Sequence, residues 1–227
     1  MFEPIPQIEW SQQTFAEICK RGHVLTSKRG IPSIIQHVGI QGDMLITKVW
    51  QKRQTISTDW LYPYQQRFCV NAKRLRSRGV VAPDVQSAGI ITGTGNRWAT
   101  YTKLEGISLR EAVTVSLEDS VKLMHYLVWL HNKGIYFRTL HLGNVLRLNS
   151  GSFGLIDVTD VYFRPWSLPA HQRARNLSTL LAYPKDVKRI SRDNGDDLLS
   201  VYMEAWKPKR NFHCAVQWLR KRRMREE

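Results

Sequence analysis

The chain has 227 residues, of which 42% are hydrophobic, and its 34 basic and 19 acidic side chains give a net charge of +15. This length suits one large domain or two small lobes with a sizeable core, and no apolar run approaches the ~18 residues that would span a bilayer. The strong positive charge favours anionic partners, namely nucleic acid, anionic lipid or a phosphorylated glycan, without choosing among them.

The cysteines and the first twenty residues indicate in which cellular compartment the protein is expected. Cys19, Cys69 and Cys214 are scattered and odd in number, which fits neither a disulfide framework nor a CxxC metal site. The first twenty residues contain acids, prolines and glutamines but no apolar segment typical of a secretory signal. We therefore expect a cytoplasmic protein with reduced thiols.

The first half of the chain predicts short strands around one helix. Residues 23–30, 33–40 and 43–52 are β-rich and separated by glycine or proline. A helix is predicted next, with Pro63 in its first turn and Gly79 at the C′ position. Its repeating face is formed by Tyr64, Phe68, Asn71 and Leu75. Residues 87–104 then predict a hairpin around a Gly-Thr-Gly-Asn turn.

The second half is predicted to be mainly helical after a connector at residues 104–113. Ser116 and Asp119 have the spacing of a capping box, and the apolar residues that follow repeat at helical spacing. Further helices are predicted within residues 167–183, 196–206 and 211–227. We expect an α+β fold with two lobes, a β-rich N-lobe (1–105) and a mainly helical C-lobe (106–227).

This order of elements is that of a two-lobed kinase, and the C-lobe contains a pattern that supports it. Small-molecule kinases of the protein-kinase-like superfamily often show H-G-D-x-H-x-x-N in the catalytic loop. Arg138, Thr139, His141 and Asn144 line up with that pattern, and Phe137 replaces its first His. Asp157, in the sequence Gly-Leu-Ile-Asp, then occupies the position of the metal-binding Asp.

Asn144 and Asp157 are the predicted metal ligands, and ATP and Mg²⁺ are the predicted cofactors. Mg²⁺ neutralises the charge of the β- and γ-phosphates and prefers oxygen ligands, which an Asn carbonyl and an Asp carboxylate supply. A hairpin between the two residues would bring them together. Each alone is also an ordinary turn residue, so the prediction rests on their joint order.

The nucleotide-binding residues predicted in the N-lobe are Lys48, Asn71 and Leu104. Strand alternation places Lys48 on one face with Ile46 and Trp50, and Lys52 is the competing choice. Asn71 occupies the place of the helix Glu that pairs with this Lys in kinases; an amide can hydrogen-bond an ammonium but cannot neutralise it. Leu104 lies in a hinge-like Leu-Glu-Gly sequence and would offer backbone groups to adenine.

Thr139 stands where the catalytic Asp is expected, and its hydroxyl is not ionised near pH 7. Positioned acid–base groups contribute about 10²–10⁴ in rate, whereas phosphoryl transfer rests mostly on positioning and charge neutralisation. The sequence therefore predicts a slow enzyme or an inactive one. His141 could substitute as a base or could be a structural histidine, and Asp160 could substitute or could be a cap or an Arg partner.

Three segments resemble the bacterial toluene-tolerance-protein family, which is related to the heptose and Kdo kinases of the lipopolysaccharide core. They are residues 50–85, residues 137–146 together with 154–161, and the Arg-Asn-Leu helix at residues 173–181. The resemblance covers roughly residues 24 to 182. It implies a kinase-like fold, ATP with Mg²⁺, and phosphorylation of core sugars at the cytoplasmic face of the inner membrane.

Two clusters of basic residues bear on the predicted binding partners. One covers residues 73–79, and the other consists of Arg220, Lys221, Arg222, Arg223 and Arg225 beside Trp218. Both suit a phosphorylated glycolipid, and the second could lie on an anionic membrane or be a solvated tail. Three functions compete: a core-sugar kinase, a pseudokinase that serves as a binding or scaffolding protein, and a nucleic-acid-binding protein. The last rests on charge alone, without a recognisable RNA-binding signature.

Overall fold

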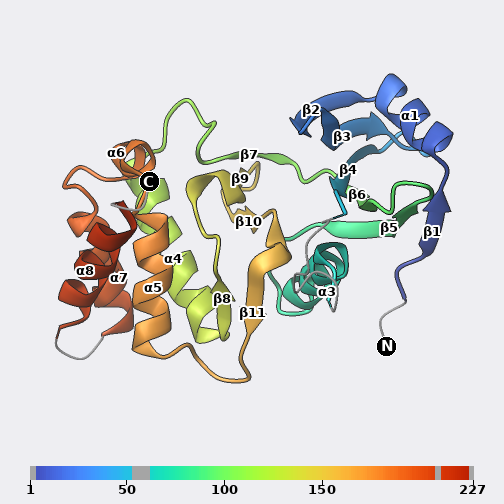
Figure 1. The fold of residues 1–227 in the computed structure, drawn as a ribbon. Helices are drawn as coiled ribbons and strands as arrows, with labels where there is room; N and C mark the ends of the chain where they lie inside the picture. Colours follow the sequence, from blue (N-terminus) through green and yellow to red (C-terminus); the bar gives the residue numbers. More distant parts are fainter. Residues whose placement is uncertain (1–3, 53–61, 208–210, 225–227) are drawn as a thin grey trace. The chain divides into compact units, whose positions relative to one another are not determined.

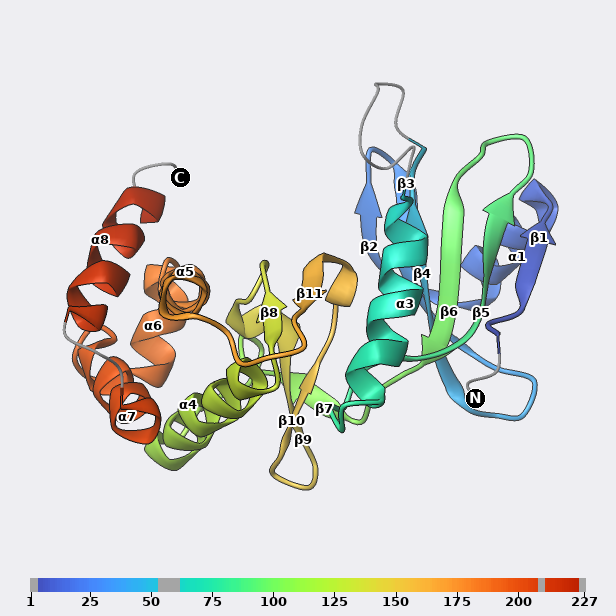
Figure 2. The ribbon, with the colours of Figure 1, turned by 90° about the horizontal axis from the view of Figure 1, so that it is seen from below.

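The computed structural model describes residues 4–52, 62–207 and 211–224. The chain divides into two compact units, Met1–Leu104 and Glu105–Glu227. Figures 1 and 2 show the strand-rich first unit in blue to green and the mainly helical second unit in green to red. Part of the segment 50–85, which carries the family resemblance, lies outside the described residues, as does Arg225.

The N-terminal unit is built on a six-stranded sheet in the order β1-β5-β6-β4-β3-β2. β1 runs parallel to β5, and the other neighbouring strands are antiparallel. The predicted hairpin is formed by β5 and β6. The strands are β1 (Gln7–Trp10), β2 (His23–Lys28), β3 (Ile31–Val38), β4 (Met44–Trp50), β5 (Asp84–Ile91) and β6 (Arg97–Thr102).

Two helices cover opposite faces of this sheet, α1 (Gln12–Arg21) and α3 (Tyr64–Arg76) (Figures 1 and 2). Of these two helices, the sequence pattern predicts α3 but not α1. Ser11 caps α1 because its hydroxyl accepts a hydrogen bond from the Thr14 N–H at 3.0 Å. The sheet face under α1 is apolar, and on it Trp10 stacks on Trp98 with ring centroids 3.5 Å apart. Its buried core consists of Ile35, Val49, Ile91 and Trp98.

The other face of the sheet packs against α3 through Phe68, which is fully buried. The Phe68 ring lies 5.4 Å from Trp50 and 5.3 Å from Tyr101, centroid to centroid. A buried side chain of this size stabilises the fold by roughly 1.5–3 kcal/mol. The predicted end of α3 is confirmed: the N–H groups of Gly79 and Val80 donate to the carbonyls of Arg76 and Leu75, respectively. With Gly79 at φ +78°, this is a Schellman motif.

The C-terminal unit combines five α-helices with short strands in the part of the chain that is described. β7 (Gly106–Ser108), β9 (Val145–Leu148) and β10 (Phe153–Leu155) form one sheet, and β8 (Ile135–Phe137) pairs with β11 (Val161–Phe163). α4 packs against α7, and α5 packs against α8 (Figure 1). The helices are α4 (Leu117–Asn132), α5 (Ala170–Leu180), α6 (Pro184–Ile190), α7 (Asp196–Trp206) and α8 (Phe212–Met224).

Helix α4 begins with the predicted capping box. The Ser116 hydroxyl accepts from the Asp119 N–H at 3.0 Å, and the Asp119 carboxylate accepts from the Ser116 N–H at 3.4 Å. Two such bonds satisfy N–H groups that the first turn leaves without partners. The buried stripe of α4 runs through Leu123, Leu127 and Leu130, whereas Leu117, the first residue of the helix, is exposed.

A buried polar network joins α4, α5 and α7 in the centre of this unit. His131 lies between Tyr202, whose hydroxyl is 2.6 Å from Nδ1, and Asn176, whose Oδ1 is 3.0 Å from Nε2. Arg173 donates to the Tyr202 hydroxyl at 3.0 Å, and the Asn176 amide donates to the Phe137 carbonyl. These bonds run in one direction if Tyr202 donates to Nδ1 and Nε2 carries the proton of a neutral His131. The network therefore ends on the backbone of the residue that precedes the candidate catalytic loop.

Helix α8 changes one prediction about the basic C-terminal cluster. Arg220 is buried and donates hydrogen bonds to the carbonyls of Leu181 and Asn194, so its guanidinium holds α8 in place and does not belong to a surface. The exposed basic residues of this helix that can be described are Lys221 and Arg222. None of the helices in the described residues is both long and apolar enough to cross a membrane.

Candidate functional site

The predicted catalytic loop connects β8 to β9 and is fixed by its own backbone. The Arg138 N–H donates to the Asp160 carbonyl at 3.0 Å, and the Leu140 N–H donates to the Phe137 carbonyl at 3.1 Å. The loop ends in a short 3₁₀-helix, η1 (Leu142–Asn144). These two bonds tie the loop to the end of β8 and to the segment before β11. Because the buried polar network also reaches the Phe137 carbonyl at the end of β8, the network, the strand and the loop are connected.

Asn144 and Asp157 lie at the two ends of the β9–β10 hairpin, as the sequence analysis predicted. β9 pairs with β10 with Val145 opposite Leu155, and the Ile156 N–H donates to the Asn144 carbonyl at 3.0 Å. Asp157 follows directly with φ 52° and ψ 48°. Asp tolerates this left-handed conformation better than most residues, at a cost of order 1 kcal/mol. The hairpin thus brings the two backbone segments side by side.

The side chains of these two residues suit an oxygen-preferring divalent cation. Asn144 is buried, and its amide N–H donates to the Thr139 carbonyl at 3.0 Å, which leaves Oδ1 as the unused acceptor within the described residues. Asp157 is exposed and carries a carboxylate. Mg²⁺ is commonly held by one or two carboxylates plus substrate phosphates, so a full protein cage is not required. No group of three or more His, Cys, Asp or Glu suited to a metal exists among the described residues.

Thr139 and His141 face a cleft of about 550 Å³ within the C-terminal unit. The cleft is lined by residues of the loop, of β8, of α5 and of the segment before α6. They are Tyr136, Arg138, Thr139, His141, Arg175, Thr179 and Tyr183. Of these, the sequence analysis proposed only Thr139 and His141 as site residues. Arg175, Thr179 and Tyr183 come from a distant part of the chain, and no local pattern relates Arg138 to Arg175.

His141 is partly buried against the ring of Tyr183, with centroids 5.7 Å apart in an edge-to-face arrangement. Burial, together with the positive charge of Arg110, lowers the pKa of His141, although the carboxylates of Asp186 and Asp157 act in the opposite direction. His141 is therefore neutral at pH 7 and a weaker base than a free histidine. Its Nδ1 is buried without a hydrogen-bond partner among the described residues.

The N-terminal residues Lys48 and Asn71 both lie between the sheet and α3. The Lys48 ammonium lies 5.3 Å from the Trp50 ring centroid and 5.7 Å from that of Phe68. Its orientation follows the predicted alternation of β4, because Val49 lies in the core under α1. Asn71 is buried on α3, one turn after Phe68. Leu104 follows β6 as the last residue of this unit and is half-buried.

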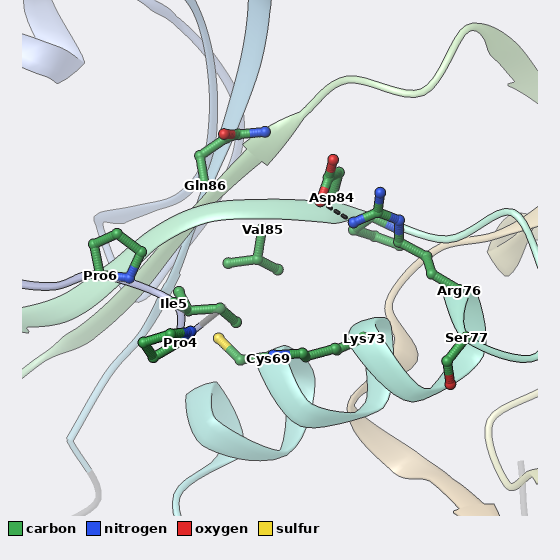
Figure 3. Close-up of a pocket in the computed structure, with 11 residues that line it drawn as sticks. Pro4, Ile5, Pro6, Cys69, Lys73, Arg76, Ser77, Asp84, Val85 and Gln86 are labelled. Atoms are coloured by element: carbon green, nitrogen blue, oxygen red, sulfur yellow. Dashed lines mark hydrogen bonds and ion pairs between the residues drawn. The ribbon is translucent and has the colours of Figure 1, made fainter. Parts of the chain in front are cut away.

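A second cavity, of about 600 Å³, lies in the N-terminal unit between the N-terminal segment, α3 and β5. Figure 3 shows Lys73 and Arg76 on α3 beside it, with Arg76 paired to Asp84. These residues belong to the basic cluster at 73–79, and the pairing reduces the positive charge available there. None of the predicted site residues lines this cavity.

Comparison with known proteins gives a fold but not a family. No protein-family model matches the sequence, and no curated protein matches it. Among solved structures, an aminoglycoside-3'-phosphotransferase of type VIII matches with a TM-score of 0.64 and 14% identity, over 87% of this chain and 92% of that chain. The chain has a protein-kinase-like fold.

Two further solved structures match the chain with lower TM-scores. An apo pseudokinase matches over 100% of this chain and 98% of that chain, with 11% identity and a TM-score of 0.51. The bifunctional kinase-methyltransferase WbdD has 18% identity over 85% of this chain and 47% of that chain, but its TM-score of 0.46 does not establish a shared fold. The predicted protein-kinase-like α+β fold is confirmed. The narrower resemblance to the toluene-tolerance-protein family stays a prediction.

Proposed function

We propose that the chain is an ATP- and Mg²⁺-dependent phosphotransferase whose acceptor is a sugar of the lipopolysaccharide core. The observation that carries the phosphotransferase part is the placement of Asn144 and Asp157 at the two ends of one hairpin, in a protein-kinase-like fold. The core-sugar part is supported by the three segments that resemble the toluene-tolerance-protein family and by the net charge of +15. A basic protein favours an anionic glycolipid over a neutral acceptor.

Each site residue has a role in this proposal. Bound Mg²⁺ would neutralise the charge of the ATP phosphates, and Asn144 Oδ1 and the Asp157 carboxylate would hold it. The bond from the Asn144 amide to Thr139 orients Oδ1. The Thr139 hydroxyl can hydrogen-bond an acceptor hydroxyl but cannot remove its proton at pH 7. His141 is neutral and could take that proton, weakly, because its pKa is lowered.

In the N-terminal unit, Lys48 is proposed to contact the α- and β-phosphates and Leu104 the adenine. Asn71 would hydrogen-bond the Lys48 ammonium without neutralising it. This set is weaker than that of an active kinase, because Asn71 carries no charge at the place of the helix Glu. The proposal therefore predicts slow turnover.

The alternative is a pseudokinase that binds nucleotide or serves as a scaffold in envelope biogenesis. It is favoured by Thr139 in place of the catalytic Asp and by Asn71 in place of the helix Glu. Both substitutions remove charge that acts in transfer, while Asn144 and Asp157 could still hold a nucleotide through its metal. The two functions differ in whether phosphate leaves ATP.

The test measures nucleotide binding and phosphate transfer separately. We expect ATP with Mg²⁺ to raise the Tm, and labelled γ-phosphate to appear in purified core oligosaccharide, with the acceptor position read by mass spectrometry. Asp157→Asn keeps a residue that tolerates the left-handed backbone and removes the charge, and should reduce transfer at least about 100-fold. A Tm shift without any transfer would favour the pseudokinase, and no shift at saturating ATP would reject both functions.

An anionic membrane is a further proposed partner, through the exposed side of α8. Trp218 is 57% exposed, and the Arg222 guanidinium lies 4.8 Å from its ring. Basic residues at an anionic bilayer contribute about 1 kcal/mol each. Changing Lys221 and Arg222 to Gln should weaken sedimentation with phosphatidylglycerol vesicles by roughly 30-fold, and neutral vesicles should bind neither protein. Equal sedimentation of the two proteins would remove this surface from the proposal.

A further inference from the structure

The arginines of the C-terminal unit fall into two groups. One group consists of arginines that are bonded to acidic side chains or to other oxygen atoms of the protein. Arg110 pairs with Asp186 and Arg147 pairs with Asp119. Arg173 and Arg220 are buried and donate to oxygen atoms of the protein. Their charges are used to hold the unit together.

Arg138 and Arg175 belong to the other group. Both are exposed and line the 550 Å³ cleft described above, one from the loop and one from α5. No acidic side chain of the described residues pairs with either, and the cleft lining itself contains no Asp or Glu. Two guanidinium groups at one concave site, without a carboxylate, leave positive charge that only a bound anion or solvent can balance.

Tyr183, which also lines the cleft, is held in place by its neighbours. The Tyr183 ring is in contact with His141, and on it lies the Arg110 guanidinium, 5.1 Å from the ring centroid. The pairing of Arg110 with Asp186 holds that guanidinium in place. A fixed aromatic ring together with a few polar groups is typical of small-molecule sites, which span about 300–1,000 Å³.

We propose that this cleft, here named the arginine cleft, binds a sugar that already carries a phosphate group. Arg138 and Arg175 would contact the phosphate, since a guanidinium forms paired hydrogen bonds with phosphate oxygens. The sugar would lie against Tyr183 with a hydroxyl near Thr139. That this sugar is the acceptor of phosphate from ATP rests on the proposed function, whereas its binding does not. A cationic amino sugar is excluded by the same charge that attracts the anion.

The experiment measures equilibrium binding of hexose monophosphates in the absence of ATP and metal. The probes are glucose 6-phosphate and glucose 1-phosphate, with glucose and glucosamine as uncharged and cationic comparisons. Binding to the full chain is followed by calorimetry or ligand-observed NMR. The variants are Arg138→Gln, Arg175→Gln and the double variant. Arg192→Gln is the matched control because Arg192 is exposed in the same unit and does not line the cleft.

We expect at least one of the hexose phosphates to bind at least about tenfold more tightly than glucose, and each cleft variant to weaken it about tenfold. Arg192→Gln should leave binding unchanged, and unchanged Tm values would show that the exposed substitutions preserve the fold. Equal binding of glucose and both phosphates, or equal loss in Arg192→Gln and Arg138→Gln, would overturn the assignment. Hexose-phosphate binding without an ATP-induced Tm shift would retain the cleft and reject the proposed function. An ATP-induced Tm shift without hexose-phosphate binding would retain the proposed function and reject the cleft as a site for a phosphorylated sugar.

Discussion

The two units differ in how they hold the residues that kinase chemistry would need. In the C-terminal unit, Asn144 is fixed by a hydrogen bond to Thr139, and a buried polar network reaches the loop through the Phe137 carbonyl. In the N-terminal unit, Lys48 lies against aromatic rings, and the residue at the position of its acidic partner is Asn71. The loop of the C-terminal unit is thus tied to a buried hydrogen-bonded network, whereas the contacts described for Lys48 are with aromatic rings.

This difference indicates which steps of the proposed phosphate transfer the residues of the chain can support. Directional bonds fix oxygen ligands to the accuracy that a metal requires, and Asn144 and Asp157 retain the residue types of active kinases. Thr139 and Asn71 stand at the positions where the proposed function would need a charged side chain, for proton transfer and for pairing with lysine, and neither carries a charge. The comparison therefore predicts a molecule that is better suited to holding a metal nucleotide than to turning it over.

The largest expected effect is a gain of activity. Thr139→Asp restores the carboxylate at the loop position, held by the same backbone bond to Asn144. Because a positioned base contributes about 10²–10⁴ in rate, we expect labelled phosphate transfer to rise by about that factor. Thr139→Asn, which has similar size and no charge, is the control and should stay at the wild-type rate. If the Thr139→Asp and Thr139→Asn variants transfer phosphate at the same rate, the missing base does not limit the rate.

The second effect is a loss of stability when the polar network is cut. Asn176→Ala removes the acceptor for the His131 N–H and the donor to the Phe137 carbonyl, both of which are buried. Leaving two buried polar groups without partners should lower the free energy of unfolding by about 2–4 kcal/mol, measured in urea. Asn149→Ala, in the exposed β9–β10 turn, should change it by less than about 0.5 kcal/mol.

Hydrogen exchange of the loop amides adds a second measurement to this comparison. If the network supports the loop, Asn176→Ala should speed exchange at Leu140 and Asn144, while amides of the N-terminal sheet stay protected. Uniform faster exchange in both units would mean that Asn176 acts on global stability and not on the loop.

The third effect is a dependence of stability on pH from His131. Burial, supported by the nearby charge of Arg173 and opposed by the hydrogen bond with Asn176, lowers its pKa from 6.5 to about 3, so His131 is neutral in the folded protein. Below pH 6.5 the unfolded chain binds a proton that the folded chain does not. Stability should therefore fall on acidification between pH 6.5 and about pH 3, by about 1.4 kcal/mol per pH unit.

His131→Gln isolates this contribution, because His37 and His141 also have lowered pKa values and titrate in both proteins. The variant should be less stable than the wild type at pH 7, and the difference should shrink as the pH falls. A constant difference between pH 7 and pH 4 would show that His131 is not the group responsible.

Much of the fold could be predicted from local sequence signals. The capping box at Ser116 and Asp119, the left-handed Gly79 and the alternation around Lys48 depend on neighbouring residues, and each is present in the structure. Helix α1 was missed because most of its residues are polar and its apolar repeat is short. That repeat, Phe15, Ile18 and Cys19, packs partly buried against the sheet, and with the N-cap Ser11 it was the available signal.

The site was predictable only where a motif lies within one stretch of chain. Asn144 and Asp157 are joined by a short hairpin, so their order in the sequence sufficed to place them together. The arginine cleft needs Arg138 and Arg175 to meet across the fold, and no spacing rule encodes that. Arg220 shows the opposite error: in a run of basic residues it resembles a solvated charge, but its position on α8 faces the protein.

The smallest expected effect decides between the two lysines of the N-terminal unit. Lys48 lies within β4 on the α3 side of the sheet, whereas Lys52 lies beyond the end of that strand and is exposed. Lys48→Met keeps the length and the aromatic contact but removes the charge, and should weaken ATP binding about tenfold, because charge-assisted hydrogen bonds contribute about 1.5–3 kcal/mol. Lys52→Met, with the same change of charge, should bind ATP like the wild type in calorimetry with Mg²⁺.

If Lys52→Met weakens binding and Lys48→Met does not, the nucleotide contacts the end of β4. If neither variant changes the affinity, the bonds in the C-terminal unit alone hold the nucleotide, and the N-terminal unit has lost its part in binding.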